Sequence, residues 1–204
     1  MTLNITAVRN PFYNPDGSVS MEACFGDATN NDGTPHYSPL TVHDDEPYSD
    51  GALLLADIRA GKYGELNLTA PPGLLFVTRE QKRAEINTWR NQQENSEYLM
   101  QYDGRRWDYG KKTQERMSIS LAMAKRNALP EGFAWTDGDN NIVPMTSDSL
   151  IALAEAIEQA MFEKGIAINT RQLQMKAELE ALNEYTAIRD YVVGWSDNPE
   201  EKQS

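Results

Sequence analysis

The residue pattern of the chain changes at Pro71-Pro72-Gly73, and this change limits the folds that are open to it. Before the prolines, turn-forming residues gather in clusters such as Asn14-Pro15-Asp16-Gly17, with short runs of strand-forming residues between them. Such clusters are typical of tight turns between strands. After the prolines, apolar residues recur every three to four positions, which predicts helices. We therefore predict an α+β protein made of two modules.

Residues 1–70 are predicted to form a small, turn-rich β module with one short helix. The expected strands cover residues 3–8, 19–25 and 40–42, each bounded by Pro, Gly, Asn or Asp. A helix is expected over residues 50–61, because its apolar residues have helical spacing and Gly61 stands where a C-terminal glycine belongs.

Residues 78–193 are predicted to form a mostly helical module with two β-hairpins. Thr78-Arg79-Glu80-Gln81 matches the capping box, so we expect the first helix to begin at Thr78. The hairpins are expected near residues 102–107 and 133–145, where Asp-Gly turns separate aromatic-rich runs. A second helix is expected over residues 113–127.

The last helices follow from the same spacing. Ser147 is the expected N-cap of a long helix that ends near Gly165. A final helix is expected over residues 170–191. Residues 194–204 are polar and are predicted to form a flexible tail.

Charge and composition remove several classes of partner. The chain has 204 residues and a formal net charge of −12. Ten Asp and Glu against three Lys and Arg give residues 1–77 a net charge of −7. Because phosphate binding needs clustered Lys and Arg, we expect no nucleic-acid partner. We also expect no membrane partner, because no stretch approaches the roughly 20 apolar residues of a membrane span.

The sequence contains no assembled catalytic or metal-binding motif. His43-Asp44-Asp45-Glu46 places potential ligands on opposite faces of an extended segment, which favours a solvated acidic turn. Asp137-x-Asp139-x-Asn141 resembles a calcium loop, but Ile142 stands where that loop needs glycine, so a hairpin turn is favoured. Cys24 lies in an apolar run and is predicted to be a core residue. We expect no enzyme activity, cofactor or metal ion.

The aromatic residues near the two hairpins allow two interpretations. In the first, they form a small sheet face that packs on the helices. In the second, some of them are exposed anchors for a protein partner. A sugar-binding role for exposed aromatics is a further alternative. The candidate partner-binding residues of the whole chain are Asp44, Asp45, Tyr48, Tyr63, Trp107 and Trp135.

Two stretches resemble proteins of tailed bacteriophages. Residues 39–48, followed by a short predicted helix that ends in Ala60-Gly61-Lys62-Tyr63-Gly64, resemble the N-terminal part of small phage tail proteins. The second stretch begins with Tyr102-Asp103-Gly104-Arg105-Arg106-Trp107 and continues through residues 129–135 and 139–146. It is similar to a C-terminal domain of unassigned function in phage tail and tail-fibre assembly proteins.

The resemblance implies a non-enzymatic protein that binds a tail fibre or tailspike and assists its folding. It implies action in the host cytoplasm during assembly, with or without retention in the virion tail. The alternative is a permanent structural component of the tail tip or baseplate. We expect the acidic first module to be the docking surface, for a basic patch on the fibre. The sequence does not indicate the chain's own oligomeric state.

Overall fold

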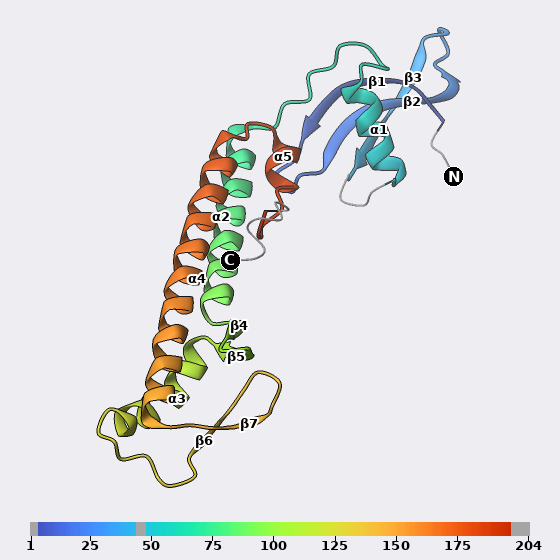
Figure 1. The fold of residues 1–204 in the computed structure, drawn as a ribbon. Helices are drawn as coiled ribbons and strands as arrows, with labels where there is room; N and C mark the ends of the chain where they lie inside the picture. The colour runs from blue at the N-terminus through green and yellow to red at the C-terminus, as the bar shows by residue number, and fades with distance from the viewer. Residues whose placement is uncertain (1–3, 44–47, 197–204) are drawn as a thin grey trace. The chain divides into compact units, whose positions relative to one another are not determined.

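The computed structural model describes residues 4–43 and 48–196. The chain forms two compact units, of which the first comprises Met1–Gln81 with Leu182–Tyr191 and the second comprises Lys82–Ala181 with Val192–Ser204. The first contains a three-stranded sheet, and the second is helical with two small hairpins (Figure 1). The predicted α+β class is confirmed.

The sheet of the first unit is an antiparallel meander in the order β1-β2-β3. Its strands are β1 (Ile5–Tyr13), β2 (Val19–Thr29) and β3 (Pro35–Val42), which are longer than the sequence predicts. The turn between β1 and β2 is held by the carboxylate of Asp16, which accepts hydrogen bonds from the Ser18 backbone N–H and hydroxyl. These local turn signals explain why the three strands are predictable.

Helix α1 (Asp50–Arg59) packs its apolar side on this sheet. The Ser49 side chain caps it by accepting a hydrogen bond from the Ala52 N–H at 3.1 Å. Leu54, Leu55 and Ile58 are buried. Gly61 follows with φ of +77°, the left-handed conformation in which a helix commonly ends.

A segment from the far end of the chain completes the first unit. Helix α5 (Tyr185–Arg189) buries Tyr185, whose ring meets that of Tyr13 edge to face with centroids 5.0 Å apart. The Tyr185 hydroxyl also lies against Gly17, where a Cβ has no room. The prediction of one helix over residues 170–191 is therefore wrong at its C-terminal end.

Helix α2 (Pro72–Glu94) begins six residues before the predicted start. Proline suits the first turn of a helix because its missing N–H has no partner there in any case. The Thr78 hydroxyl donates to the Leu74 carbonyl at 2.8 Å, as in a helix interior. The predicted capping box at Thr78 is therefore wrong.

The second unit contains both predicted hairpins. The first consists of β4 (Tyr98–Tyr102) and β5 (Arg105–Tyr109), and the second of β6 (Ala134–Thr136) and β7 (Ile142–Pro144). They pack with α3 (Lys111–Ala124) and α4 (Ser147–Ala181) around one core. Its most deeply buried members are Trp107, Met117, Ala124, Leu150, Leu153 and Ile157.

Helix α4 continues through Gly165, so the predicted break there is wrong. Glycine inside a helix costs about 1 kcal/mol relative to alanine. Ile157 and Ile168 are buried on either side of it, and Met175 and Leu179 continue the same buried face. Burying four such side chains outweighs the cost of one glycine.

The start of the predicted flexible tail is also packed. The Gly194 carbonyl accepts a hydrogen bond from Arg171 Nε at 2.8 Å. Trp195 packs edge to face on Trp89 with ring centroids 5.1 Å apart. A flexible tail from residue 194 does not fit these contacts, and residues 197–204 lie outside the described residues.

Candidate functional site

A groove in the first unit lies between α1 and the beginning of β1. Its cavity volume is about 200 Å³. Two of its lining residues are aspartates, one is the candidate residue Tyr63, and half-exposed Leu53 supplies apolar surface. The lining residues are Asn4, Ile5, Asp50, Leu53, Leu54, Asp57, Lys62 and Tyr63. We call this set the acidic groove.

The two aspartates of the acidic groove differ in their partners. Asp57 accepts a hydrogen bond from Lys62 Nζ, and this bond raises the pKa of Lys62. Lys62 Nζ also lies 5.5 Å from the centre of the Tyr63 ring. The Asp50 carboxylate has no hydrogen-bond or ion-pair partner among the residues that the structure describes. The Asp50 carboxylate is therefore the negative charge that remains available to a ligand.

Tyr48 lies two residues before Asp50 and is the most exposed large hydrophobic side chain described. Its exposed fraction is 89%. Its backbone adopts φ of +65°, a conformation that costs an L-residue other than glycine roughly 1–2 kcal/mol. Exposed aromatics and strained backbone both gather at functional sites. Tyr48 is therefore the strongest of the sequence-predicted candidates.

The other candidates occupy different environments. Tyr63 is half-buried and packs against the core of the first unit. Asp44 and Asp45 lie outside the described residues. The structure thus brings Tyr63 into the acidic groove and places Tyr48 close to it in the chain.

Trp107 is a core residue, and the partner-binding interpretation is wrong for it. Only 3% of it is exposed, and its indole Nε1 donates to the Tyr102 carbonyl at 3.1 Å. Trp135 is half-buried against the same core, with its ring centroid 6.4 Å from that of Phe133. The packing interpretation therefore describes the hairpin aromatics better than the anchor interpretation does.

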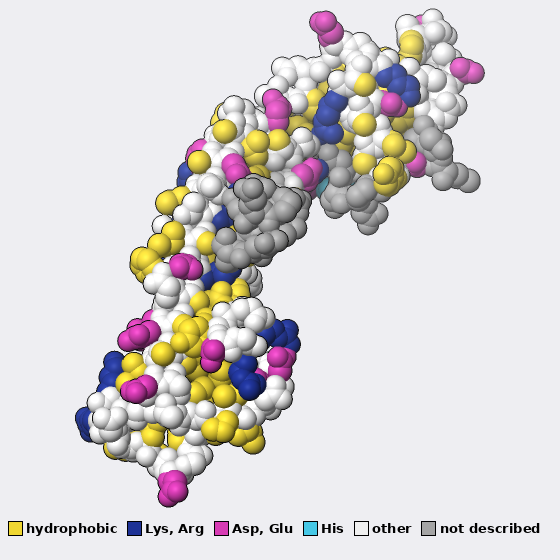
Figure 2. All heavy atoms as spheres, viewed as in Figure 1, with side chains coloured by type: hydrophobic (Ala, Val, Ile, Leu, Met, Phe, Trp, Pro, Cys, Tyr) yellow, Lys and Arg dark blue, Asp and Glu magenta, His cyan; other side chains and the backbone are white. Residues whose placement is uncertain are grey.

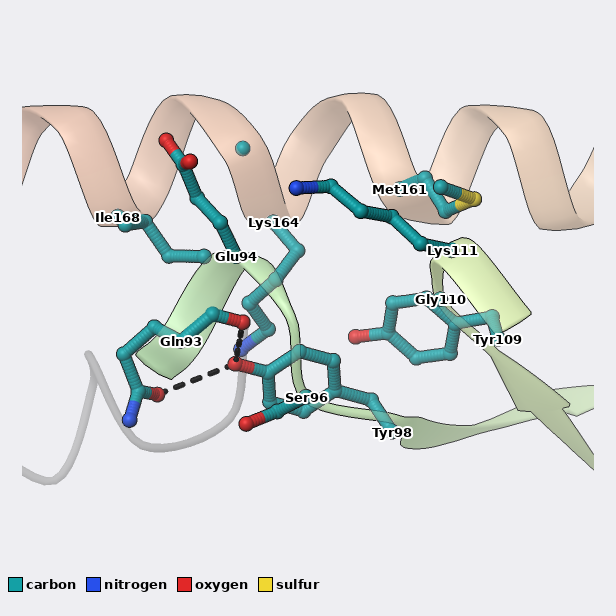
Figure 3. Close-up of a pocket in the computed structure, with 11 residues that line it drawn as sticks. Gln93, Glu94, Ser96, Tyr98, Tyr109, Gly110, Lys111, Met161, Lys164 and Ile168 are labelled. Carbon is teal, nitrogen blue, oxygen red and sulfur yellow. Dashed lines mark hydrogen bonds between the residues drawn. The ribbon is translucent and has the colours of Figure 1, made fainter. Parts of the chain in front are cut away.

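A second cavity, of about 230 Å³, lies in the second unit between the end of α2, the β4–β5 hairpin and α4 (Figure 3). The Tyr98 hydroxyl donates to the Gln93 carbonyl at 2.8 Å. Lys164 Nζ lies 5.0 Å from the centre of the Tyr98 ring and 5.2 Å from that of Trp195. These contacts join α2, β4 and α4 with the chain after α5.

Burial shifts the pKa values of three side chains that line this second cavity. It lowers the pKa of Lys164 and raises the pKa of Tyr98 and Tyr109. The two ring faces partly compensate the half-buried ammonium group of Lys164 through cation–π attraction. Sequence patterns missed this cluster, because Gln93, Lys164 and Trp195 are too far apart in the chain to form a local motif. We interpret it as a structural anchor of the hairpin.

The calcium-like sequence at Asp137 forms the β6–β7 turn. Asp137 Oδ1 accepts hydrogen bonds from the backbone N–H groups of Asp139 and Asn141 at 3.0 and 2.8 Å. Arg105 Nη1 lies 3.3 Å from the other carboxylate oxygen. Across the described ranges, no group of His, Cys, Asp and Glu is placed to hold a metal ion. The hairpin-turn prediction is confirmed.

Among residues 4–43 and 48–196, no helix is both long and apolar enough to cross a bilayer. This agrees with the charged residues that interrupt α2 and α4.

Comparison with known proteins identifies one family. Residues 77–193 match the model of the domain of unknown function DUF4376. Neither the curated proteins nor the solved structures gave a match. The matched segment covers more than half of the chain and includes both hairpins, α3, α4 and α5. The chain therefore belongs to the DUF4376 family.

Proposed function

We propose that this chain is a non-enzymatic phage tail protein that binds a tail fibre or tailspike and assists its folding. The observation that carries the proposal is the acidic groove with the highly exposed Tyr48 close to it in the chain. The resemblance of residues 39–48 and 60–64 to phage tail proteins falls on this same region.

The chemistry of the groove specifies the partner's surface. The Asp50 carboxylate, which has no partner among the described residues, attracts Lys or Arg, and the low content of basic residues in the first unit strengthens this attraction. Tyr48 offers a large aromatic face that fits an apolar pocket. A folding fibre exposes apolar surface and strand edges until its trimer closes, and a bound cover would prevent aggregation.

The two edges of the sheet are less suited to that contact. Edge strand β1 contains Pro11, and edge strand β3 contains Pro35 and Pro39. Proline lacks the N–H that a partner strand would need and commonly protects strand edges from pairing. We therefore place the contact at the groove and not at a strand edge.

Co-expression with a tail-fibre protein encoded in the same genome tests the proposal. We expect more soluble fibre trimer with the protein than without it. Equal yields of trimer in the two cultures would contradict the proposal. Mass spectrometry of purified virions then separates an assembly factor, which is absent or substoichiometric, from a permanent tail component.

Point variants test whether the fibre binds at the acidic groove. Tyr48→Ala and Asp50→Asn should each lower fibre co-purification about tenfold, because side chains at the centre of an interface dominate its affinity. Asp27→Asn is the matched control, since Asp27 is an exposed acidic residue of β2 outside the groove. An equal loss in all three variants would indicate a general charge effect and would remove the groove from the proposal.

A further inference from the structure

The outer side of α4 carries large apolar side chains in contact with solvent. Phe162, Ile166 and Leu173 are 65%, 52% and 59% exposed. Their spacing of four and seven places them on one face of the helix. Figure 2 shows hydrophobic side chains along this region of the molecule. We call this set the α4 stripe.

The α4 stripe is separate from the face that α4 uses in its own unit. That inner face buries Ile157, Ile168, Met175 and Leu179. Large exposed apolar side chains aligned on the face opposite the buried one are typical of a surface that binds a partner. Gln172 shows where α2 already lies, because its Nε2 donates to Asn87 at 3.0 Å.

We propose that the α4 stripe binds the same stripe of a second copy of the chain, with the two helices antiparallel. A two-fold axis at the level of Ala167 and Ile168 brings Phe162 opposite Leu173 of the second copy. Ile166 then lies level with Asn169 of the second copy. A single self-complementary face of this kind closes into a dimer and leaves no free stripe.

Charge complementarity selects the second copy and the antiparallel direction. Glu158 and Lys176 lie on the same side of the stripe, because 18 residues make about five full turns. Neither forms an ion pair with another described residue. In the antiparallel pair, Glu158 of each copy meets Lys176 of the other, so two ion pairs form.

The parallel arrangement lacks this match. It would place Glu158 beside Glu163 of the second copy and so oppose like charges. In the antiparallel arrangement, like charges face each other at two levels related by the two-fold axis, where Glu155 of each copy faces Glu180 of the other. Arg83 already neutralises Glu180 within each copy, with Nε 3.0 Å from the carboxylate. The antiparallel dimer is therefore favoured.

Sedimentation equilibrium of the full chain tests the dimer. We expect a dimer for the natural sequence and a monomer with unchanged far-ultraviolet circular dichroism for the variant Phe162→Gln/Ile166→Gln/Leu173→Gln. Ile142→Gln is the matched control, because Ile142 is 79% exposed on β7 and should leave the dimer intact. A monomeric natural chain, a larger oligomer, or a triple variant that still dimerises would overturn the proposal.

Charge reversal tests the direction. Glu158→Lys should weaken dimerisation by roughly five- to tenfold, because it turns two exposed ion pairs into two repulsions. The double variant Glu158→Lys/Lys176→Glu should restore it. In a parallel dimer Glu158→Lys would instead strengthen association, by removing its repulsion with Glu163, and that result would overturn the proposal.

Disulfide trapping gives an independent readout. Phe162→Cys mixed with Leu173→Cys should form a disulfide-linked heterodimer, while neither variant should cross-link efficiently alone. Native Cys24 is buried and does not compete. Efficient cross-linking of Phe162→Cys with itself would contradict the antiparallel register. The dimer goes beyond the proposed fibre binding, which uses Tyr48 and the acidic groove, so each can fail without the other.

Discussion

Asp137 is a buried acidic side chain of the second unit, with 2% exposure. Its carboxylate is held by the N–H groups of Asn141 and Asp139, by the Asn141 amide and by Arg105. Of these, the backbone hydrogen bond from Asn141 lowers the pKa of Asp137 most. The ionised form is therefore the one that the folded turn stabilises.

This lowered pKa predicts acid sensitivity. The contribution of Asp137 is fully present above its ordinary pKa of 3.8 and is lost as the pH falls through the lower folded value. Asp137→Asn should flatten the dependence of unfolding free energy on pH below about pH 4, as measured by urea unfolding. Glu131→Gln, at an exposed position before β6, is the control. Parallel pH profiles for Asp137→Asn and the natural chain would contradict this role.

Gly17 and Gly33 form a matched pair of turn glycines in the first unit. Their φ angles are +85° and +82°, so alanine is equally strained at both. Only at Gly17 would a Cβ meet another group, the Tyr185 hydroxyl. Gly17→Ala should therefore lower the free energy of unfolding by about 1–3 kcal/mol more than Gly33→Ala.

A second variant removes the contact between a Cβ at position 17 and the Tyr185 hydroxyl. Combining Gly17→Ala with Tyr185→Phe, which removes the hydroxyl, should recover part of the difference in urea-unfolding free energy. Equal losses for Gly17→Ala and Gly33→Ala would show that the two turns differ only in position and that the hydroxyl yields without cost.

At the scale of single elements, α4 is the feature that local patterns describe least well. Gly165 lies in its interior, exposed, with open space where a Cβ would be. Gly165→Ala should therefore stabilise the chain by about 0.5–1 kcal/mol through helix propensity alone. Thermal unfolding would measure this as a higher Tm, and a lower Tm would show that the glycine itself is needed.

The elements that the sequence predicts correctly contain turn or capping residues that mark their ends. Asp16-Gly17 and Asp103-Gly104 mark hairpins, and Ser49 with Gly61 marks the ends of α1. The errors at Thr78 and Gly165 have one cause. A local start or stop signal was overruled by burial of side chains on both sides of it, which no short window of sequence contains.

The candidate site shows the same difference between residues with a local sequence signal and residues whose role depends on contacts made on folding. Tyr48 and Tyr63 belong to the short sequence stretches that resemble phage tail proteins. Tyr63 lines the acidic groove, and Tyr48 lies two residues before the groove residue Asp50 in the chain. Trp107 could not be distinguished from an exposed anchor by its neighbours in sequence, because its burial depends on α3 and α4. The cluster of Lys164 and Trp195 depends on chain segments that meet only after folding.

At the scale of the whole molecule, the two units are not two consecutive segments. The first unit takes Leu182–Tyr191 from beyond α4. Tyr185 buries its ring there against Tyr13. Tyr185→Ala should therefore destabilise the first unit by about 3 kcal/mol, as large-to-small changes in cores do.

Hydrogen exchange can assign that loss to one unit. Amides of β1 to β3 should exchange faster in Tyr185→Ala, while amides of α3 and of α4 around Leu153 should keep their protection. Equal loss of protection in both units would contradict the assignment of residues 182–191 to the first unit.

The return of the chain to the first unit has a consequence for how such proteins can diversify. A single crossover near Pro72 would exchange the N-terminal sequence but leave the old residues 182–191 behind, with Tyr185 facing an unfamiliar sheet. A new N-terminal module is therefore inherited intact only when a second exchange carries this short segment with it. Chimaeras between relatives should be built with two junctions, and those with one should fold poorly.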